Sequence, residues 1–211
     1  MADRLAALGG AVFAVASVAA GVALPPPPAQ DASASLVRTF FADHRDAVVA
    51  GSVASVVAVL GLLLFTTALA DRLGRRIIAT AGAVTAAVAL LGGLLQAVLA
   101  NTAARLTDDS SLLALYSVER TVFYNAPPII MSVVLLGAAA ALPRVLGAAG
   151  AVVALLALVD GLVNVASTAG LPAGIGLAGF LLTVAWVAGT SWWLGHEPRE
   201  LPHLAGQPVP A

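Results

Sequence analysis

The residue most able to do chemistry in this sequence is Asp160, an acid deep inside a long apolar run from 145 to 168. An ionised carboxylate is unfavourable in hydrocarbon, so an acid at this position predicts a functional site with a partner. Asn164 follows four residues later, and a helix places both side chains on one face. The partner that we expect for Asp160 is Arg120, with Tyr124 and Asn125 as the other candidates.

A second polar stripe precedes two prolines. Tyr116, Arg120 and Tyr124 recur at intervals of four, so a helix aligns them and a guanidinium can stack on a phenol ring. The residues that we expect to form a ligand site in the outer half of the membrane are Asp160, Asn164, Arg120, Tyr124, Asn125, Glu119 and Gln96.

The prolines that follow this stripe predict an irregular backbone. Pro127 and Pro128 lack N–H groups, so the helix that contains them must kink or restart. In the alternative arrangement, residues 112–124 form an interfacial helix and a span restarts at Pro127, with Asn125 near the capping position.

The composition indicates a membrane protein. The chain is 60% hydrophobic and 10% charged, whereas soluble domains have about 45–50% and 25%. Six apolar segments have about the 20 residues that cross a bilayer as a helix. The predicted spans are residues 5–24, 47–70, 77–100, 121–142, 145–168 and 171–194. Lipid offers no partners to the backbone, so the predicted fold class is all-α, a polytopic bundle of six transmembrane helices.

These spans form one predicted domain, residues 1–195, followed by a polar, proline-rich tail, residues 196–211, that we expect to be disordered. Basic residues favour the cytoplasmic side of a membrane. With the N-terminus inside, six of the ten arginines fall inside, and the outer loops carry most of the acids. Both termini are therefore expected in the cytoplasm. We expect the first span to be retained and not cleaved as a signal peptide, because four prolines occupy the cleavage region.

Several classes of function are disfavoured. The chain has no cysteine, and its three histidines share no ligand spacing, so we expect neither a metal nor a cofactor. A net charge of −1 argues against a nucleic-acid partner. The partner that the composition does imply is the membrane lipid bilayer.

Two resemblances can be seen. The cytoplasmic segment Leu69-Ala70-Asp71-Arg72-Leu73-Gly74-Arg75-Arg76 resembles the loop between the second and third helices of major facilitator transporters. The proline-ended first helix, the segment VRTFFADHR at 37–45 and the tyrosine-rich entry to the fourth span are similar to small six-helix bacterial membrane proteins of unknown function, of an actinobacterial type. The second resemblance implies a fold and no particular chemistry.

The sequence favours a structural or accessory membrane protein, because a helical bundle needs nothing further. The alternative is a transporter or binder of a small, partly apolar ligand, held in an outer cavity around Asp160. An intramembrane enzyme using Asp160 and Glu119 as a carboxylate pair is the third hypothesis. A second copy of the chain or another membrane subunit would suit the first hypothesis as partner.

Overall fold

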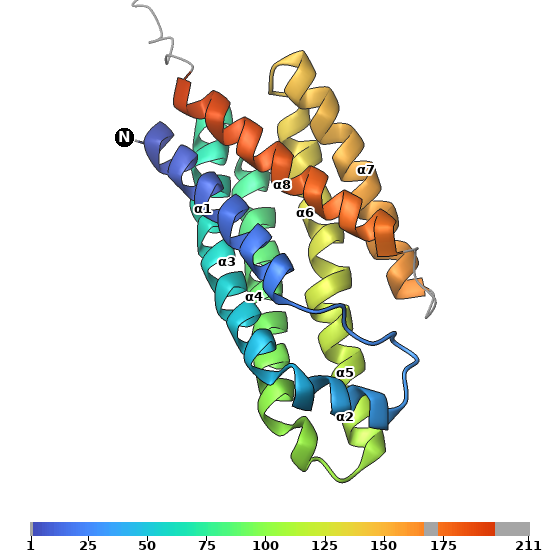
Figure 1. Cartoon of the computed structure of the whole chain (residues 1–211). Coiled ribbons are helices and arrows are strands. Elements are labelled where there is room, and N and C mark those ends of the chain that lie inside the picture. Colours follow the sequence, from blue (N-terminus) through green and yellow to red (C-terminus); the bar gives the residue numbers. More distant parts are fainter. Residues whose placement is uncertain (1, 167–172, 197–211) are drawn as a thin grey trace, which may run out of the picture.

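The computed structural model describes residues 2–166 and 173–196, which are almost entirely helical and contain no strand (Figure 1). The predicted all-α fold is therefore confirmed. The predicted disordered tail lies outside the described residues, apart from His196 at the end of the last helix.

Six helical segments are long and apolar enough to cross a membrane, as the sequence predicts for a multi-pass membrane protein. They are α1 Ala2–Ala23, α3 Arg45–Leu73, α4 Arg76–Thr102, the continuous segment made of α5 Asp109–Arg120, η2 Thr121–Asn125 and α6 Ala126–Ala139, then α7 Arg144–Ala166 and α8 Ala173–His196. The remaining elements are α2 Ala34–Asp43 and the short helix η1 Ala103–Arg105.

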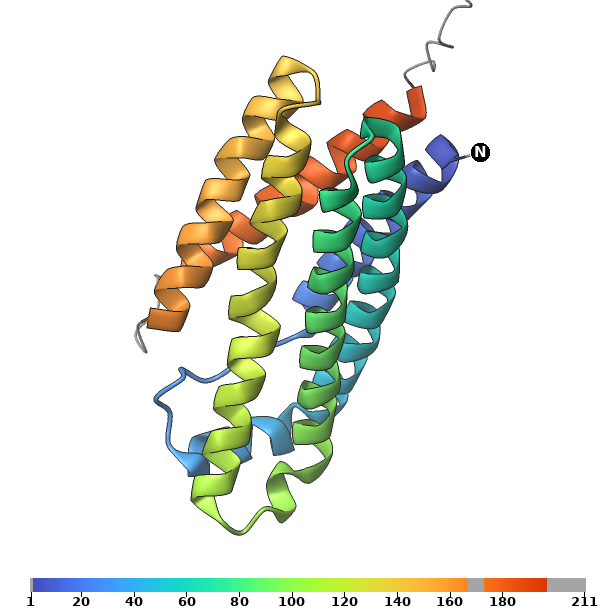
Figure 2. The same ribbon diagram turned by 180° about the vertical axis from the view of Figure 1, so that it is seen from behind.

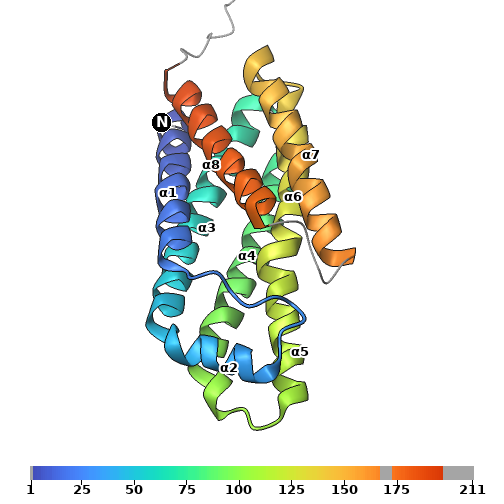
Figure 3. The ribbon, with the colours of Figure 1, turned by 45° about the vertical axis from the view of Figure 1, so that its right-hand side comes forward.

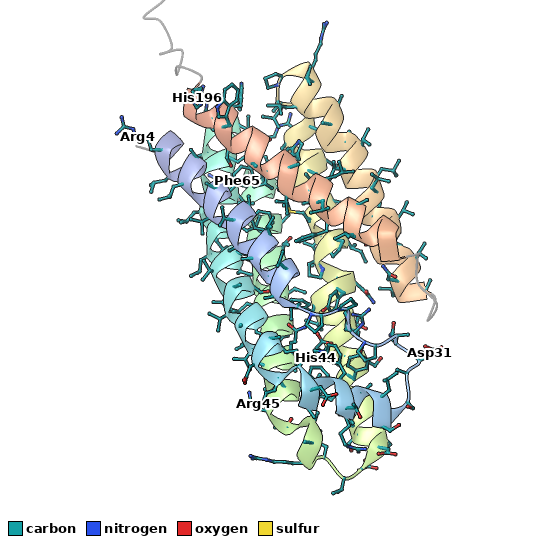
Figure 4. The ribbon with its side chains drawn as sticks, in the orientation of Figure 1. Arg4, Asp31, His44, Arg45, Phe65 and His196 are labelled. Carbon is teal, nitrogen blue, oxygen red and sulfur yellow. The ribbon has the colours of Figure 1, made fainter. Side chains whose placement is uncertain are left out.

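The six segments form a closed ring in the order α1, α3, α4, α6, α7, α8, because each packs against the next and α8 returns to α1 (Figure 2). Arg4 and His196 lie at one end of the bundle, which we call the terminal end (Figure 4). The opposite, distal end carries α2, which lies across the ends of α3, α4 and α5 (Figure 3). Large apolar side chains such as Val22, Val145 and Leu155 are exposed on the outside of the ring, which suits a surface facing lipid.

The contact between α1 and α3 depends on glycine. A Cβ atom on Gly61 of α3 would lie 2.5 Å from the backbone nitrogen of Phe13 on α1, and one on Gly9 would lie 2.7 Å from that of Phe65. The two backbones therefore touch directly, as small residues allow in membrane bundles.

The bundle contains two separate apolar cores. The core at the terminal end includes Phe65, Leu135 and Trp186, and the core at the distal end includes Phe41, Leu99 and Tyr116. Polar residues lie between them along α3, α4 and the α5–α6 segment, and two more lie on α7, so the bundle contains a polar layer. We define this polar layer as Ser52, Gln96, Glu119, Arg120, Tyr124, Asn125, Asp160 and Asn164.

The fourth spanning segment begins at Asp109, twelve residues before its predicted start. Asp108 caps the helix, since its carboxylate accepts hydrogen bonds from the backbone N–H and the hydroxyl of Ser111 and from the hydroxyl of Ser110. The hydrogen bond from the Ser111 hydroxyl, and to a smaller extent that from the Ser110 hydroxyl, lowers the pKa of Asp108 to about 2. A charged N-cap of this kind starts the helix where the apolar pattern alone does not.

Candidate functional site

The segment Thr121–Asn125 is a single π-helical turn inside an otherwise continuous helix. The N–H of Ala126 donates to the carbonyl of Thr121, five residues earlier, and Pro127 and Pro128 then fall in the first turn of α6. Neither proline has an N–H to donate to a carbonyl of the preceding turn, so the regular α-helical hydrogen bonding is interrupted at this point. The irregular backbone agrees with the sequence, and α6 begins after Asn125 as in the alternative prediction, but α5, the π-turn and α6 are continuous and α5 is not a separate helix. Such π-turns are frequent at functional sites.

Glycines on two neighbouring helices hold the π-turn tightly. A Cβ on Gly92 of α4 would lie 2.7 Å from the Cα of Phe123, and one on Gly161 of α7 would lie 2.9 Å from the carbonyl oxygen of Asn125. Both are closer than side-chain carbons normally approach a backbone. The π-turn therefore fits between α4 and α7 only because neither position carries a side chain.

Three of the predicted site residues form a hydrogen-bonded chain between α7 and the π-turn. The side-chain amide of Asn164 donates to Asp160 Oδ1 at 2.9 Å, and the amide of Asn125 donates to the carbonyl oxygen of Asn164 at 3.3 Å. Asn125 is only 4% exposed. Asp160 also lies against α8, because a Cβ on Gly176 would be 3.4 Å from its Oδ1. The acid therefore sits where three helical segments meet.

The expected pairing of Asp160 with Arg120 is wrong. Within residues 2–166 and 173–196 the ion pairs are Arg38 with Asp109 and Arg45 with Asp46. Arg120 instead stacks on the ring of Tyr124, with its Cζ 4.2 Å from the ring centre. The predicted stacking between Arg120 and Tyr124 is therefore present, and it places the guanidinium on the Tyr124 ring and not beside Asp160.

Gln96 links the π-turn to the other side of the ring. Its amide donates to the hydroxyl of Tyr124 at 3.3 Å, and its Oε1 accepts from the hydroxyl of Ser52 at 3.3 Å. Gln96 and Ser52 are 3% and 4% exposed, so α3, α4 and the π-turn share a buried polar contact. Ser52 was not among the predicted site residues; the only sequence signal for it is one hydroxyl at the edge of an apolar run.

Glu119 and Arg120 are the members of the polar layer that are left incompletely bonded. Glu119 is 1% exposed, and its Oε1 has no hydrogen-bond partner; the same holds for the buried NH1 of Arg120. The neighbouring Tyr116 donates its hydroxyl to the carbonyl of Pro28 at 2.5 Å, which fastens the α1–α2 connection beside this region. Leaving a buried carboxyl oxygen without a hydrogen bond is unfavourable. Glu119 Oε1 and Arg120 NH1 can therefore still accept and donate a hydrogen bond.

No protein-family model, curated protein or solved structure matches this chain. The function must therefore be argued from the site itself.

The two acids of the hypothetical carboxylate pair have different neighbours. Asp160 contacts Asn164 and faces Gly176 of α8, whereas Glu119 lies on the buried face of α5, three residues after Tyr116. The part of the chain that the structure describes contains no group of three histidine, aspartate or glutamate residues that could hold a metal ion. A groove of about 290 Å³ opens at the distal end, but none of the predicted site residues lines it.

Proposed function

We propose that this chain is a multi-pass membrane protein of the structural or accessory class, in which the polar layer holds a closely packed six-helix ring together. The observation that carries this proposal is the pair of hydrogen bonds that run from Asn125 to Asn164 and from Asn164 to Asp160. A network of this kind fixes the rotation and depth of its helices. The partner would be a second copy or another membrane subunit, bound against the lipid-facing surface.

Within this proposal both termini are cytoplasmic. The terminal end carries Arg4, Arg72, Arg75, Arg76 and Arg144 beside the two ends of the described chain, and Figure 4 shows Arg4 and His196 together there. The distal end carries the acids Asp31, Asp43, Asp46, Asp108 and Asp109 in addition to its arginines. An excess of arginine in the short inner loops supports this orientation.

Reporter fusions test this topology. We expect a cytoplasm-active reporter to function after Gly74 and after the last residue, and a periplasm-active reporter to function after Asp108. Both reporters are placed at every site, so that each position serves as its own control. Periplasmic activity after Gly74 would reverse the orientation, and equal activity of one reporter at all three sites would contradict the multi-pass arrangement.

A second candidate function is a small-molecule transporter or binder. The observation that favours it is the unused Glu119 Oε1 and Arg120 NH1 beside the π-turn, which could receive a small, partly apolar ligand with both a donor and an acceptor. The resemblance of residues 69–76 to major facilitator transporters implies the same class. The two candidates differ in one physical property: a binding site admits water or ligand to the polar layer, and a structural network excludes both.

A further inference from the structure

We propose that the groove at the distal end binds an anionic phospholipid, with the lipid phosphate between Arg45 and Arg105. The groove has a volume of about 290 Å³ and lies between the start of α3 and the end of α4 with η1. Arg45, Arg105 and Asn101 provide its polar side, and Phe41, Ala100 and Ala104 provide its apolar side. The inference goes beyond the proposed function, and it depends only on the chain being embedded in a membrane.

The two arginines stand at the level where phospholipid headgroups are expected. Arg45 is the first residue of α3, immediately before its apolar run, and Arg105 ends the apolar segment that begins at Arg76. Figure 4 shows Arg45 at the edge of the distal end. Arginine binds phosphate through several N–H groups at once, and juxtamembrane basic residues attract anionic lipid.

The polar contacts inside the groove leave room for an anion. Arg45 donates to Asn101 Oδ1 at 2.7 Å, which holds its guanidinium against α4, and to Asp46 at 3.2 Å. The Asp46 side chain is 94% exposed, so water screens this ion pair and it competes weakly. Arg105 is exposed and forms no ion pair with the residues that the structure describes. Its charge is therefore available to a phosphate.

The surface below the groove fits an acyl chain. Leu94 and Val98 of α4 and Val53 of α3 are 53%, 47% and 61% exposed, and spacings of four and three residues place Leu94, Val98 and Asn101 on one face of α4. A lipid whose phosphate sits between the arginines would extend its chain along this apolar face. A free phosphate ion would make no use of it, which is why the proposal commits to a lipid.

Lipid titration in detergent, followed by native mass spectrometry, tests the site. The probes are dioleoylphosphatidylglycerol, dioleoylphosphatidylcholine and inorganic phosphate, and the proteins are the parent chain, Arg105→Gln and Arg144→Gln. Arg144 is the matched control, since it is also an exposed arginine at the end of a span but lies at the terminal end. We expect Arg105→Gln to weaken phosphatidylglycerol binding about fivefold, from about 1 kcal/mol per basic residue near the membrane surface. Arg144→Gln should keep the affinity of the parent.

Phosphatidylcholine should bind the parent more weakly than phosphatidylglycerol, and inorganic phosphate should not displace the lipid. Equal affinity in Arg105→Gln and the parent would overturn the site, as would an equal loss in both variants. Displacement by inorganic phosphate would show an anion site without lipid selectivity. The thermal unfolding of each variant without added lipid shows whether it is folded; if Arg105→Gln is not, Arg45→Gln replaces it with the same expected loss.

Discussion

Gly61→Ala is expected to destabilise the protein by up to about 3 kcal/mol, the upper part of the range for overpacking a buried contact. The new methyl group would lie 2.5 Å from the backbone nitrogen of Phe13 and 2.7 Å from the carbonyl oxygen of Gly9. A backbone cannot rotate away as a side chain can, so α1 and α3 must separate along their contact. The gain of about 1 kcal/mol in helix propensity is too small to offset this loss. Thermal unfolding in detergent measures the result.

Gly93→Ala is the matched control for this substitution. Gly93 is also a buried glycine inside a long spanning helix, but a Cβ there would meet Phe123 Cε2 at 3.8 Å, an ordinary contact. Only the gain in helix propensity should then be seen, so Gly93→Ala is expected to be as stable as the parent or more so. If Gly61→Ala and Gly93→Ala unfold at the same temperature, the direct backbone contact between α1 and α3 does not exist.

Asn125→Leu is expected to lower the stability by between about 0.6 and 2 kcal/mol, because the substitution keeps the branching of the side chain and removes its amide donor. The carbonyl oxygen of Asn164 loses the bond that joins α7 to the π-turn. Thr102→Val is the control, since the Thr102 hydroxyl donates only to Val98 of its own helix. Thermal unfolding in detergent compares the two. An Asn125→Leu protein as stable as Thr102→Val would mean that the cross-helix bond does not hold the ring together.

Much of the fold could be predicted from the sequence because the bilayer imposes simple rules. Apolar length predicted the six spans, and proline chemistry predicted the irregular backbone near Pro127. Spacing along a single helix also predicted two contacts that the structure contains, Arg120 with Tyr124 and Asn164 with Asp160. All of these depend on local geometry, which one sequence specifies well.

Contacts between helices could not be predicted in the same way. A π-turn adds one residue to a helical turn, so the faces before and after it are rotated relative to each other. Arg120 precedes the π-turn and Asn125 ends it. Counting depth along the sequence therefore predicted that both Arg120 and Asn125 approach Asp160. In the structure only Asn125 is connected to Asp160, through Asn164. Ser52 was missed for a similar reason, because its role depends on which face of α3 meets Gln96.

Thiol labelling of single cysteines tests whether the polar layer is closed to water. The chain contains no cysteine, so Ser52→Cys and Asn125→Cys report on the layer and Ser110→Cys, at the exposed start of α5, is the positive control. The protein is placed in nanodiscs, where water reaches both faces, and is treated with a charged, water-soluble maleimide before and after unfolding in sodium dodecyl sulfate.

We expect Ser110→Cys to react at once in the folded protein, and Ser52→Cys and Asn125→Cys to react only after unfolding. Rapid labelling of both layer positions in a folded protein would contradict a closed structural network and would favour the ligand-binding candidate.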